Sequence, residues 1–348
     1  MDKSRLSYIA APMVNQSDLP FRLLVRKYGA TLAYTQMLLP SKLLNDRDYL
    51  DFHQRDLSIA STLGELGNGT PVVVQLCGDD PEMIVSAGKK LQGYCDAIDL
   101  NLGCPQEAAR EGHYGAYLLG PKDRKLVQDI VSDMSNSLTV PISVKLRLCN
   151  PAPSTIDLGL SLEACGASWV ALHARTISAR NRRKGAADLS VVKNLKEALT
   201  IPVVSNGNVR QWQDLQKNLE VTGADGVMVG ETLLGNPCIF AGVNPDPFQI
   251  SLEYLDLCRQ YPETVTIPIV QSHIRHFVDF KLGRRPWYKK FRATIGECQT
   301  LDDIQAHIVG WMKTLKVYDN AGPADCDSNA TRDGDDDDTA DIDLTSLW

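Results

Sequence analysis

The chain has 348 residues, of which 43% are apolar and 23% charged, as in a folded globular protein with a sizeable core. No apolar run approaches the roughly 18 residues of a membrane helix, and the nine cysteines form no CxxC pair, so we expect no membrane span, signal peptide or disulfide framework. The net charge of −7 comes from residues 323–348, whose nine aspartates and one arginine give −8 and leave +1 for the rest, so a polyanionic partner is not excluded.

Short β-rich runs alternate with helical patterns over residues 6–240. The expected strands are Leu6–Ala11, Ala30–Thr35, Val72–Leu76, Ala97–Leu100, Ile142–Leu146, Trp169–Leu172, Val203–Ser205 and Gly226–Val229. Helical patterns between them include Pro81–Leu91, Lys122–Asn136, Ser190–Ala198 and Trp212–Val221. Strands and helices that alternate in this way predict an α/β fold, a parallel (β/α)8 TIM barrel over residues 1–243.

After residue 243 the strand patterns stop and helical patterns take over. The expected helices are Phe248–Tyr261, Val270–Leu282, Trp287–Thr294 and Leu301–Leu315. They predict a smaller, all-helical C-terminal domain over residues 244–319. We expect residues 320–348 to form a disordered acidic tail, because this segment has too little apolar surface to fold.

Polar residues follow most of the expected strands at their C-terminal ends. They are Gln75, Asn101, Cys104, Lys145, Arg147, His173, Arg175, Asn206 and Asn208. The C-terminal ends of barrel strands surround one pocket, which holds the active site in TIM-barrel enzymes. We therefore expect these side chains to converge. Cys104 lies on a tight turn, where its thiol can be a nucleophile or a proton donor, although a lone cysteine is more often buried and inert.

Two glycine-containing turns follow the last two expected strands. Gly207 and Gly230 would let the backbone approach an anion closely, and in barrels these two turns commonly bind a phosphate. Lys145 lies between the apolar residues Val144 and Leu146, which favours an inward-pointing cation over a lysine that reaches out to water. The sequence thus predicts a pocket for a phosphate-bearing, electron-rich ligand.

Six runs occur in an order and with a spacing that resemble one family. They are Ala10-Ala11-Pro12-Met13, Val74-Gln75-Leu76, Asp99-Leu100-Asn101-Leu102-Gly103-Cys104-Pro105, Val144-Lys145-Leu146-Arg147, Leu172-His173-Ala174-Arg175-Thr176 and Asn206-Gly207-Asn208. Together they resemble the FMN-dependent tRNA-dihydrouridine synthases. The run Gly112-His113-Tyr114-Gly115 resembles the eukaryotic branch that acts on D-loop positions 16 and 17. Two positions depart from the family: Ala174 stands for the usual Gly, and Glu231 stands where many members have Arg.

The resemblance implies an enzyme that reduces the C5=C6 bond of a uridine in tRNA. NADPH or NADH would reduce FMN, flavin N5 would deliver hydride to C6, and Cys104 would protonate C5. The implied cofactor-binding residues are Pro12, Met13, Gln75, Lys145, His173, Asn206, Gly207, Asn208 and Gly230. The resemblance also implies that Asn101, Arg147 and Arg175 face the uracil.

The helical segment contains a basic run that we expect to bind tRNA. Its cations include Arg284, Arg285, Lys289 and Lys290, and they are interleaved with Phe280, Trp287, Tyr288 and Phe291. Basic and aromatic residues together favour RNA contact, although a basic run can be a solvated face and the aromatic residues can belong to the core.

Two other functions stay open. One is an FMN-dependent barrel enzyme that acts on a free pyrimidine or enone, which would not need the basic helical domain. The other is a catalytically inactive RNA-binding relative, which would not need Cys104 and Lys145. The six histidines show no HxH or HExxH spacing, so we expect no metal site. We expect a monomeric cytoplasmic protein with no membrane partner, and a nuclear location stays open.

Overall fold

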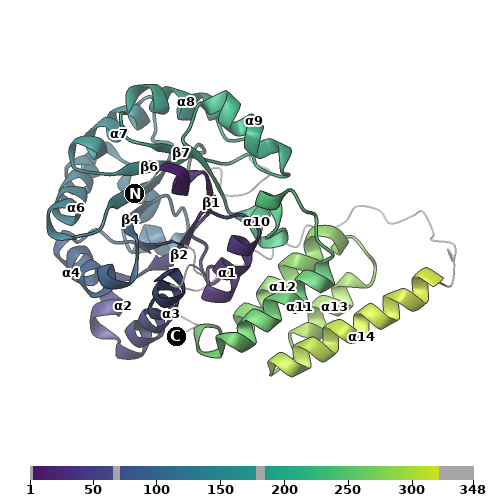
Figure 1. Cartoon of the computed structure of the whole chain (residues 1–348). Helices are drawn as coiled ribbons and strands as arrows, with labels where there is room; N and C mark the ends of the chain where they lie inside the picture. The colour runs from purple at the N-terminus through teal and green to yellow at the C-terminus, as the bar shows by residue number, and fades with distance from the viewer. Residues whose placement is uncertain (1–2, 66–70, 178–184, 321–348) are drawn as a thin grey trace.

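The computed structural model describes residues 3–65, 71–177 and 185–320, so the expected acidic tail from residue 321 onward lies outside the described residues. Eight parallel strands follow one another around a closed barrel, and β1 also pairs with β8 (Figure 1). They are β1 (Tyr8–Ala10), β2 (Leu32–Leu38), β3 (Val72–Leu76), β4 (Ala97–Leu102), β5 (Ile142–Arg147), β6 (Trp169–His173), β7 (Val203–Asn206) and β8 (Gly226–Val229). The predicted TIM barrel is confirmed.

The first two strands differ from their expected bounds. β1 begins at Tyr8 because Lys3–Leu6 forms a 3-10 turn in place of the expected strand start. β2 begins later than expected because the Ala30 N–H closes the turn after the first helix, donating to the Val25 carbonyl at 3.0 Å.

Helices cover the outside of the barrel. They are α1 (Leu19–Lys27), α2 (Pro40–Asn45), α3 (Arg47–Glu65), α4 (Pro81–Leu91), α5 (Glu107–Glu111), α6 (Arg124–Ser137), α7 (Ser154–Ala164), α8 (Leu189–Ala198), α9 (Gln213–Thr222) and α10 (Glu231–Gly235). Aspartates cap the N-termini of α1 and α4: Asp18 accepts from the Phe21 N–H and Asp80 from the Met83 N–H, each at 3.0 Å. A proline in the first turn of both helices fits this cap, since the missing N–H is not needed there.

The barrel interior is filled by apolar side chains in its lower layers. Tyr34 and Trp169 are fully buried there, together with small and aliphatic residues such as Ala97 and Met228. Polar side chains replace them toward the C-terminal ends of the strands, where Gln75 and other polar residues begin. Because the lower layers are packed, a site can form at the C-terminal ends of the strands, the end of the barrel that we call the mouth.

The C-terminal part is helical, as expected. It contains α11 (Pro247–Gln260), α12 (Ile267–Leu282), α13 (Tyr288–Ile295) and α14 (Leu301–Asn320), and it lies beside α1 and α10 of the barrel (Figure 1). One hydrophobic cluster joins both parts, with Phe21 and Val229 from the barrel and Phe277 and Phe291 from the helices. The domain boundary at residue 243 stays a prediction.

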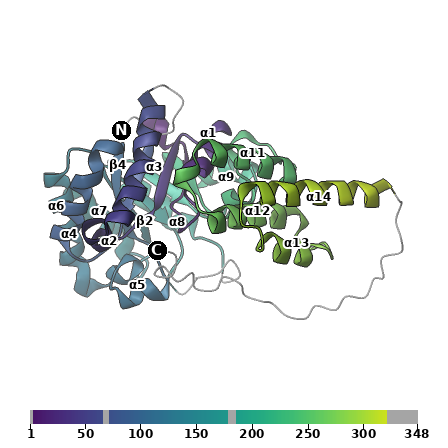
Figure 2. The same ribbon diagram turned by 90° about the horizontal axis from the view of Figure 1, so that it is seen from below.

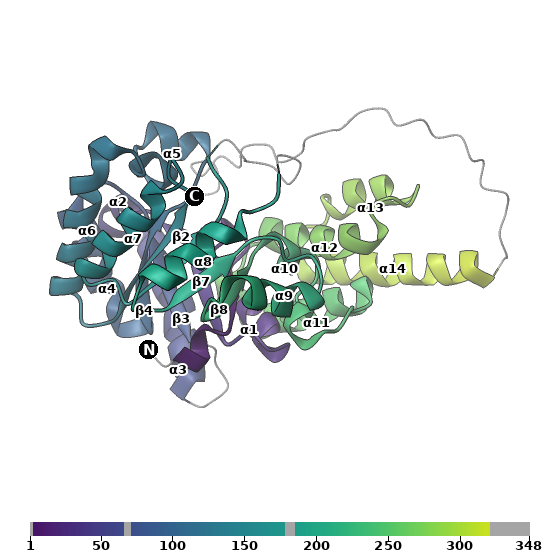
Figure 3. The same ribbon diagram turned by 90° about the horizontal axis from the view of Figure 1, so that it is seen from above.

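One end of the helical part lies on the same side of the molecule as the mouth of the barrel. α5, which follows β4 at the mouth, and α13 lie on the same side of the molecule in the views from below and from above, with the N-terminus on the opposite side (Figures 2 and 3). Residues of α13 can therefore contact a large ligand that also reaches the mouth.

Candidate active site

A buried chain of hydrogen bonds crosses the mouth and ends at the turn that carries the thiol. Gln75 Nε2 donates to Asp99 Oδ2 at 2.8 Å, and Asn101 Nδ2 donates to Gln75 Oε1 at 2.7 Å. Asn101 Oδ1 accepts from the backbone N–H groups of Gly103 and Cys104, both at 2.9 Å. Asp99 and Asn101 lie on one face of β4 because side chains alternate along a strand. The amide of Asn101 therefore anchors the Cys104 turn.

Cys104 is placed to hold a proton. Its side chain is mostly buried, and its thiol donates to Gln106 Oε1 at 3.7 Å. Burial raises the pKa of the thiol, although the backbone N–H of Gln106 and the charges of Arg147 and Lys145 act in the opposite direction. A thiol with a raised pKa stays protonated at neutral pH, so it can act as a general acid rather than as a thiolate nucleophile.

Glycine is required behind this turn. Gly115 has φ +66°, and a Cβ at this position would lie 2.8 Å from the carbonyl oxygen of Cys104. A larger residue would push the turn that carries the thiol toward the mouth.

Lys145 and His173 contribute a cation and a neutral ring from β5 and β6. The pKa of Lys145 is lowered to about 8, mainly by burial and then by the charge of Arg147, against the opposite effects of Asp99 and Cys104. Burial also lowers the pKa of His173 to about 2, with Lys145 as the next cause, so the imidazole is neutral. In the described part of the chain Lys145 has no ion-pair or hydrogen-bond partner for its ammonium group, which suits an electron-rich ligand.

The two arginines of the mouth differ in what they contact. Arg147 Nε donates to the Gly103 carbonyl at 2.9 Å and its Nη1 to the Thr176 carbonyl at 3.1 Å, so much of its guanidinium braces the Cys104 turn. That Arg147 also faces the uracil stays a prediction. The Nε of Arg175 is buried and lacks a hydrogen-bond partner among the described residues. A buried donor without a partner is a good candidate for contact with a ligand.

The turn after β7 binds the segment at Ala187, just before α8, through side-chain hydrogen bonds. Asn208 Oδ1 accepts from the Ala187 N–H and Asn208 Nδ2 donates to the Ala187 carbonyl, each at 2.8 Å, so this side chain fastens the neighbouring segment. That Asn208 also binds a cofactor stays a prediction. Asn206 Nδ2 donates to a carbonyl of β8 at 2.8 Å. Gly207 has φ +128°, and a Cβ there would lie 2.7 Å from the Ala187 Cβ, so only glycine fits.

The loops after β1 and β8 are neighbours, as the cofactor expectation requires. The Ala11 N–H donates to the Val229 carbonyl at 2.9 Å, and a Cβ built on Gly230 would lie 3.8 Å from Met13 Sδ. Pro12 and Met13 are partly exposed in this loop. The mouth therefore brings together the residues expected from β1, β3, β4, β5, β6, β7 and β8, and whether each binds a cofactor stays a prediction.

The basic run and its aromatic neighbours separate in the structure. Arg284, Arg285, Lys289 and Lys290 are all exposed. Tyr288 and Phe291 are instead buried in the core that the helices share with the barrel, and Trp287 lies against Trp311 with ring centroids 5.1 Å apart. The expectation that these aromatic residues contact RNA is wrong for Tyr288 and Phe291, because the packing of α11–α14 covers them.

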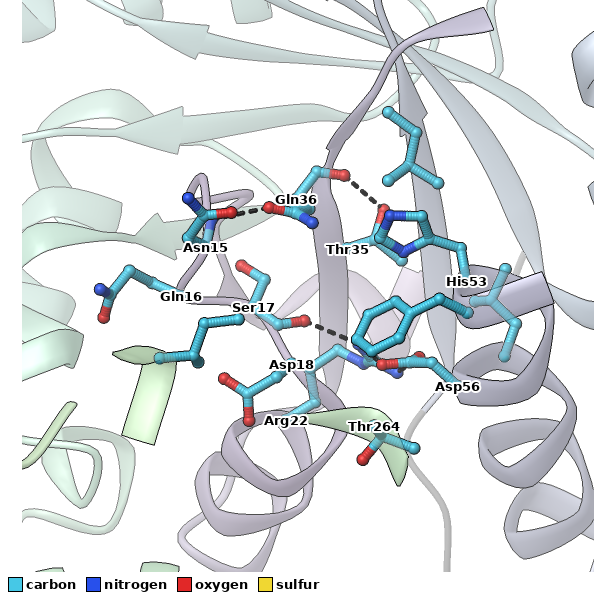
Figure 4. A pocket seen from close by; sticks show the side chains of 14 residues that line it. Asn15, Gln16, Ser17, Asp18, Arg22, Thr35, Gln36, His53, Asp56 and Thr264 are labelled. Atoms are coloured by element: carbon cyan, nitrogen blue, oxygen red, sulfur yellow. Dashed lines mark hydrogen bonds and ion pairs between the residues drawn. The ribbon is translucent and has the colours of Figure 1, made fainter. Parts of the chain in front are cut away.

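A second buried polar cluster lies where α1 and α3 meet the helical part, around a small pocket (Figure 4). We call it the junction cluster; it comprises Asp18, Arg22, Asp56 and His273. Arg22 forms an ion pair with Asp56, and Asp18 Oδ2 lies 2.7 Å from His273 Nε2. Each charged group here has a partner within the chain. No group of three or more His, Cys, Asp or Glu side chains in the described segments is arranged to hold a metal ion.

Sequence reasoning missed two contributors to the mouth, Asp99 and His113. Asp99 lies two residues before Asn101, and this period-two spacing on a strand was the signal that both share the inner face. His113 follows α5, with Nδ1 3.0 Å from Asp79 Oδ2 and Nε2 3.4 Å from Asp123 Oδ1. It links the segments that follow β3 and β4, a role that no local pattern indicates.

Comparison with known proteins identifies the family. The family model described as "Dihydrouridine synthase (Dus)" matches residues 9–309, so the chain belongs to this family. A mouse protein named tRNA-dihydrouridine(16/17) synthase [NAD(P)(+)]-like is 35% identical over 301 residues, covering 86% of this chain and 60% of the relative. A human protein named tRNA-dihydrouridine(20a/20b) synthase [NAD(P)+]-like is 34% identical over 306 residues, covering 87% of this chain and 91% of the relative.

The chain spans 60% of the length of the mouse relative and 65% of a rat relative with the same name. Among solved structures, a 2-naphthoyl-CoA reductase complex has a TM-score of 0.51 at 10% identity and covers 67% of this chain and 49% of its own. A morphinone reductase mutant in complex with tetrahydroNAD has a TM-score of 0.50 at 11% identity, with 70% and 90% covered. At these identities the likeness shows the barrel fold alone. No described helix is both long enough and apolar enough to span a bilayer.

Proposed function

We propose that this protein is a tRNA-dihydrouridine synthase that reduces the C5=C6 bond of a D-loop uridine, with FMN as cofactor and NADPH or NADH as reductant. Membership of the dihydrouridine synthase family supports the reaction. The observation that carries the proposal is the buried Cys104 thiol on a turn anchored by Asn101, with Lys145 and His173 on the neighbouring strands β5 and β6. Burial raises the pKa of this thiol, which favours its protonated form. A general acid next to a cationic pocket is what this reduction needs from the protein.

The residues of the mouth fit FMN. Gln75 offers an amide, Lys145 an ammonium group without a partner in the described chain, and His173 a neutral ring for the isoalloxazine. Gly207 and Gly230 have no side chain that would keep a phosphate away from their backbone N–H groups. These N–H groups matter here because Glu231 stands where many family members have an arginine. When bound, FMN supplies the hydride for uracil C6, which it takes from the nicotinamide.

The protein itself supplies the proton. The Cys104 thiol would give its proton to uracil C5, and its raised pKa keeps the proton on Sγ until C5 gains negative charge. The thiolate left behind would lie near Arg147 and Lys145, both of which act to lower the pKa of Cys104. The thiol then takes up a proton from solvent, so each reduced uridine costs one hydride and one proton.

Two further contacts would orient the substrate. The target base must leave the tRNA stack to enter a barrel mouth, as in other enzymes that act on a single base. Arg175 Nε, buried and without a partner in the described chain, would donate to a uracil carbonyl. The exposed cations at residues 284–290 lie just before or within α13, which is on the same side of the molecule as the mouth (Figure 3). They would contact tRNA phosphates.

We propose position 16 or 17 of the D-loop as the target. The run Gly112-His113-Tyr114-Gly115 resembles the branch that acts there. Relatives from mouse and baker's yeast with 16/17 in their names are each 35% identical to this chain. Because the human 20a/20b relative is 34% identical, the position must be mapped on the product tRNA.

The experiment incubates the FMN-loaded protein with unmodified tRNA and NADPH and maps dihydrouridine along the product. We expect product at position 16 or 17, and a loss of about 100-fold or more in rate for Cys104→Ala, the usual range for removal of a general acid. Cys298→Ala, a change at a half-buried cysteine of the helical part, is the matched control and should keep the rate. No product despite bound FMN would favour a free pyrimidine or enone as substrate, and no FMN binding at all would favour an inactive RNA-binding relative.

The tRNA surface has its own test. The double variant Arg284→Ser/Arg285→Ser should weaken tRNA binding about tenfold at moderate salt and reduce the slope of log K against log salt by about two, one for each lost phosphate contact. The control Lys89→Ser/Lys217→Ser removes the same charge from exposed positions on the barrel wall and should leave the slope unchanged. Equal effects of the two double variants would show a general charge effect instead of a binding surface.

A further inference from the structure

Asp99 is a fully buried carboxylate below the mouth, and two chains of hydrogen bonds converge on it. In the lower arm, Trp169 Nε1 donates to Tyr34 Oη at 3.1 Å, and Tyr34 Oη lies 3.4 Å from Ser143 Oγ. Ser143 Oγ then donates to Asp99 Oδ1 at 2.6 Å. This arm ties the carboxylate to the packed floor of the barrel.

The upper arm rises from the same carboxylate to the Cys104 turn. Asp99 Oδ2 accepts from Gln75, and Gln75 Oε1 accepts from Asn101. Asn101 Oδ1 accepts the two backbone N–H groups of the turn, from Gly103 and Cys104. Every donor in both arms therefore points toward Asp99.

The direction of the upper arm follows from chemistry at its two ends. An ionised carboxylate only accepts, so Gln75 must turn its NH2 group toward Asp99 and its oxygen toward Asn101. Two backbone N–H groups only donate, so Asn101 must turn its oxygen toward the turn. Reversing either amide would place N–H against N–H in a buried site, which costs free energy comparable to losing a hydrogen bond.

We infer that Asp99 is a positioning residue: as the acceptor at the base of the upper arm, it fixes the amide orientations of Gln75 and Asn101 and thereby holds the turn that carries Cys104. The catalytic meaning of that turn rests on the proposed function. The coupling between Asp99 and the turn does not, because it is a property of the hydrogen bonds alone.

Three variants separate the acceptor from the rest of the network. Asp99→Leu removes the acceptor and keeps the number and branching of the side-chain heavy atoms. Asp99→Asn keeps an oxygen for Gln75 and can offer its NH2 group to Ser143 Oγ, which is able to accept. Ser143→Ala cuts the lower arm and leaves the upper arm intact.

The readout is the rate at which iodoacetamide alkylates Cys104 in the ligand-free protein, followed by mass spectrometry of the Cys104 peptide. All eight cysteines in the described segments are free thiols, so each reports on its own surroundings. Fully buried Cys258, on α11 in the core shared with the helices, reports general loosening of the fold. The measurement is made at pH 8, above the pKa of about 7 to which burial raises Asp99, so that the carboxylate is ionised.

We expect Asp99→Leu to raise the Cys104 rate about tenfold, roughly the free energy of one buried hydrogen bond, with no change at Cys258. Asp99→Asn and Ser143→Ala should stay within about twofold of the unmodified protein, since a factor of two is well below one hydrogen bond. An unchanged Cys104 rate in Asp99→Leu would overturn the inference, as would equal acceleration at Cys104 and Cys258. An Asp99→Asn variant as fast as Asp99→Leu would overturn the acceptor role.

A second variant keeps the test valid if Asp99→Leu does not fold. Gln75→Leu cuts the same arm one step higher and should produce the same selective increase at Cys104. An unchanged Cys104 rate in that variant would overturn the inference. Because alkylation needs neither FMN nor tRNA, failure here and failure of the proposed function are separate results.

Discussion

Two buried charged regions of this molecule differ in how their charges are balanced. The junction cluster between barrel and helices pairs each charge within the chain: Arg22 with Asp56, and Asp18 with His273. The mouth of the barrel holds Lys145, Arg147 and Arg175 close together, and Asp99 is the carboxylate that acts on Lys145. One region is balanced by its own residues and the other carries excess positive charge.

The difference indicates which of the two regions stabilises the fold and which can bind a ligand. A buried ion pair that satisfies itself can fix how two parts of a chain pack, but it leaves nothing for a ligand to contact. A buried cation beside a second cation is unfavourable unless an anionic or electron-rich ligand compensates the charge. Burial, and then the neighbouring charge of Arg147, lower the pKa of Lys145 to about 8. This contrast supports the ligand site proposed at the mouth and favours a structural role for the junction cluster.

The largest expected effect comes from breaking the junction. Arg22→Met removes the partner of Asp56 and also a hydrogen bond to the Ser17 carbonyl of 2.7 Å, leaving a buried carboxylate uncompensated. We expect a loss of about 3–5 kcal/mol in the free energy of unfolding, measured by urea denaturation with tryptophan fluorescence. The double variant Arg22→Met/Asp56→Leu should recover most of it. A loss below about 1 kcal/mol in the single variant would mean that the pair is not structural.

A smaller effect concerns the pH dependence of stability at the junction. Burial, and then Arg22, lower the pKa of His53 to about 3, so the folded state keeps it neutral while the unfolded chain binds a proton below about pH 6.5. The unfolded state thus binds more protons, and His53 makes stability fall as the pH falls from about 6.5 toward 3.

His53→Phe should flatten the curve of unfolding free energy against pH by up to about 1.4 kcal/mol per pH unit in this window. The ring should be tolerated, because Tyr49 and Phe52 already pack edge-on against His53. Above pH 7 the two curves should run parallel, since the imidazole is then neutral in both states. Equal slopes below pH 6.5 would show that His53 is protonated in the folded protein.

The smallest effect on stability is expected at the mouth. Lys145→Met removes a half-buried cation without a partner in the described chain, so the free energy of unfolding of the ligand-free protein should change by less than about 1 kcal/mol or increase. The same change should weaken FMN binding about tenfold or more, measured by flavin fluorescence, because it removes a charge-assisted contact. Lys196→Met, at a lysine paired with Asp225 at 2.7 Å, is the control and should leave FMN affinity unchanged. A large loss of stability in Lys145→Met would erase the distinction between the two regions.

The sequence alone determined the barrel and which residues lie at the C-terminal ends of its strands. Strand and helix periodicities are local, and in any parallel (β/α)8 barrel the C-terminal ends of the strands converge, so Gln75, Cys104, Lys145 and His173 had to lie at one end of the barrel. The glycine at position 207 was also readable, because its backbone conformation admits little else.

Only the tertiary structure decided which partners these side chains have. Arg147 braces Gly103 and Asn208 fastens Ala187, contacts between segments that are far apart in the chain. The position of Phe291 in the core likewise depends on how α11–α14 pack. A side-chain hydrogen bond depends on distances of a few tenths of an ångström between elements, which strand register and helix packing set and which local sequence patterns do not encode.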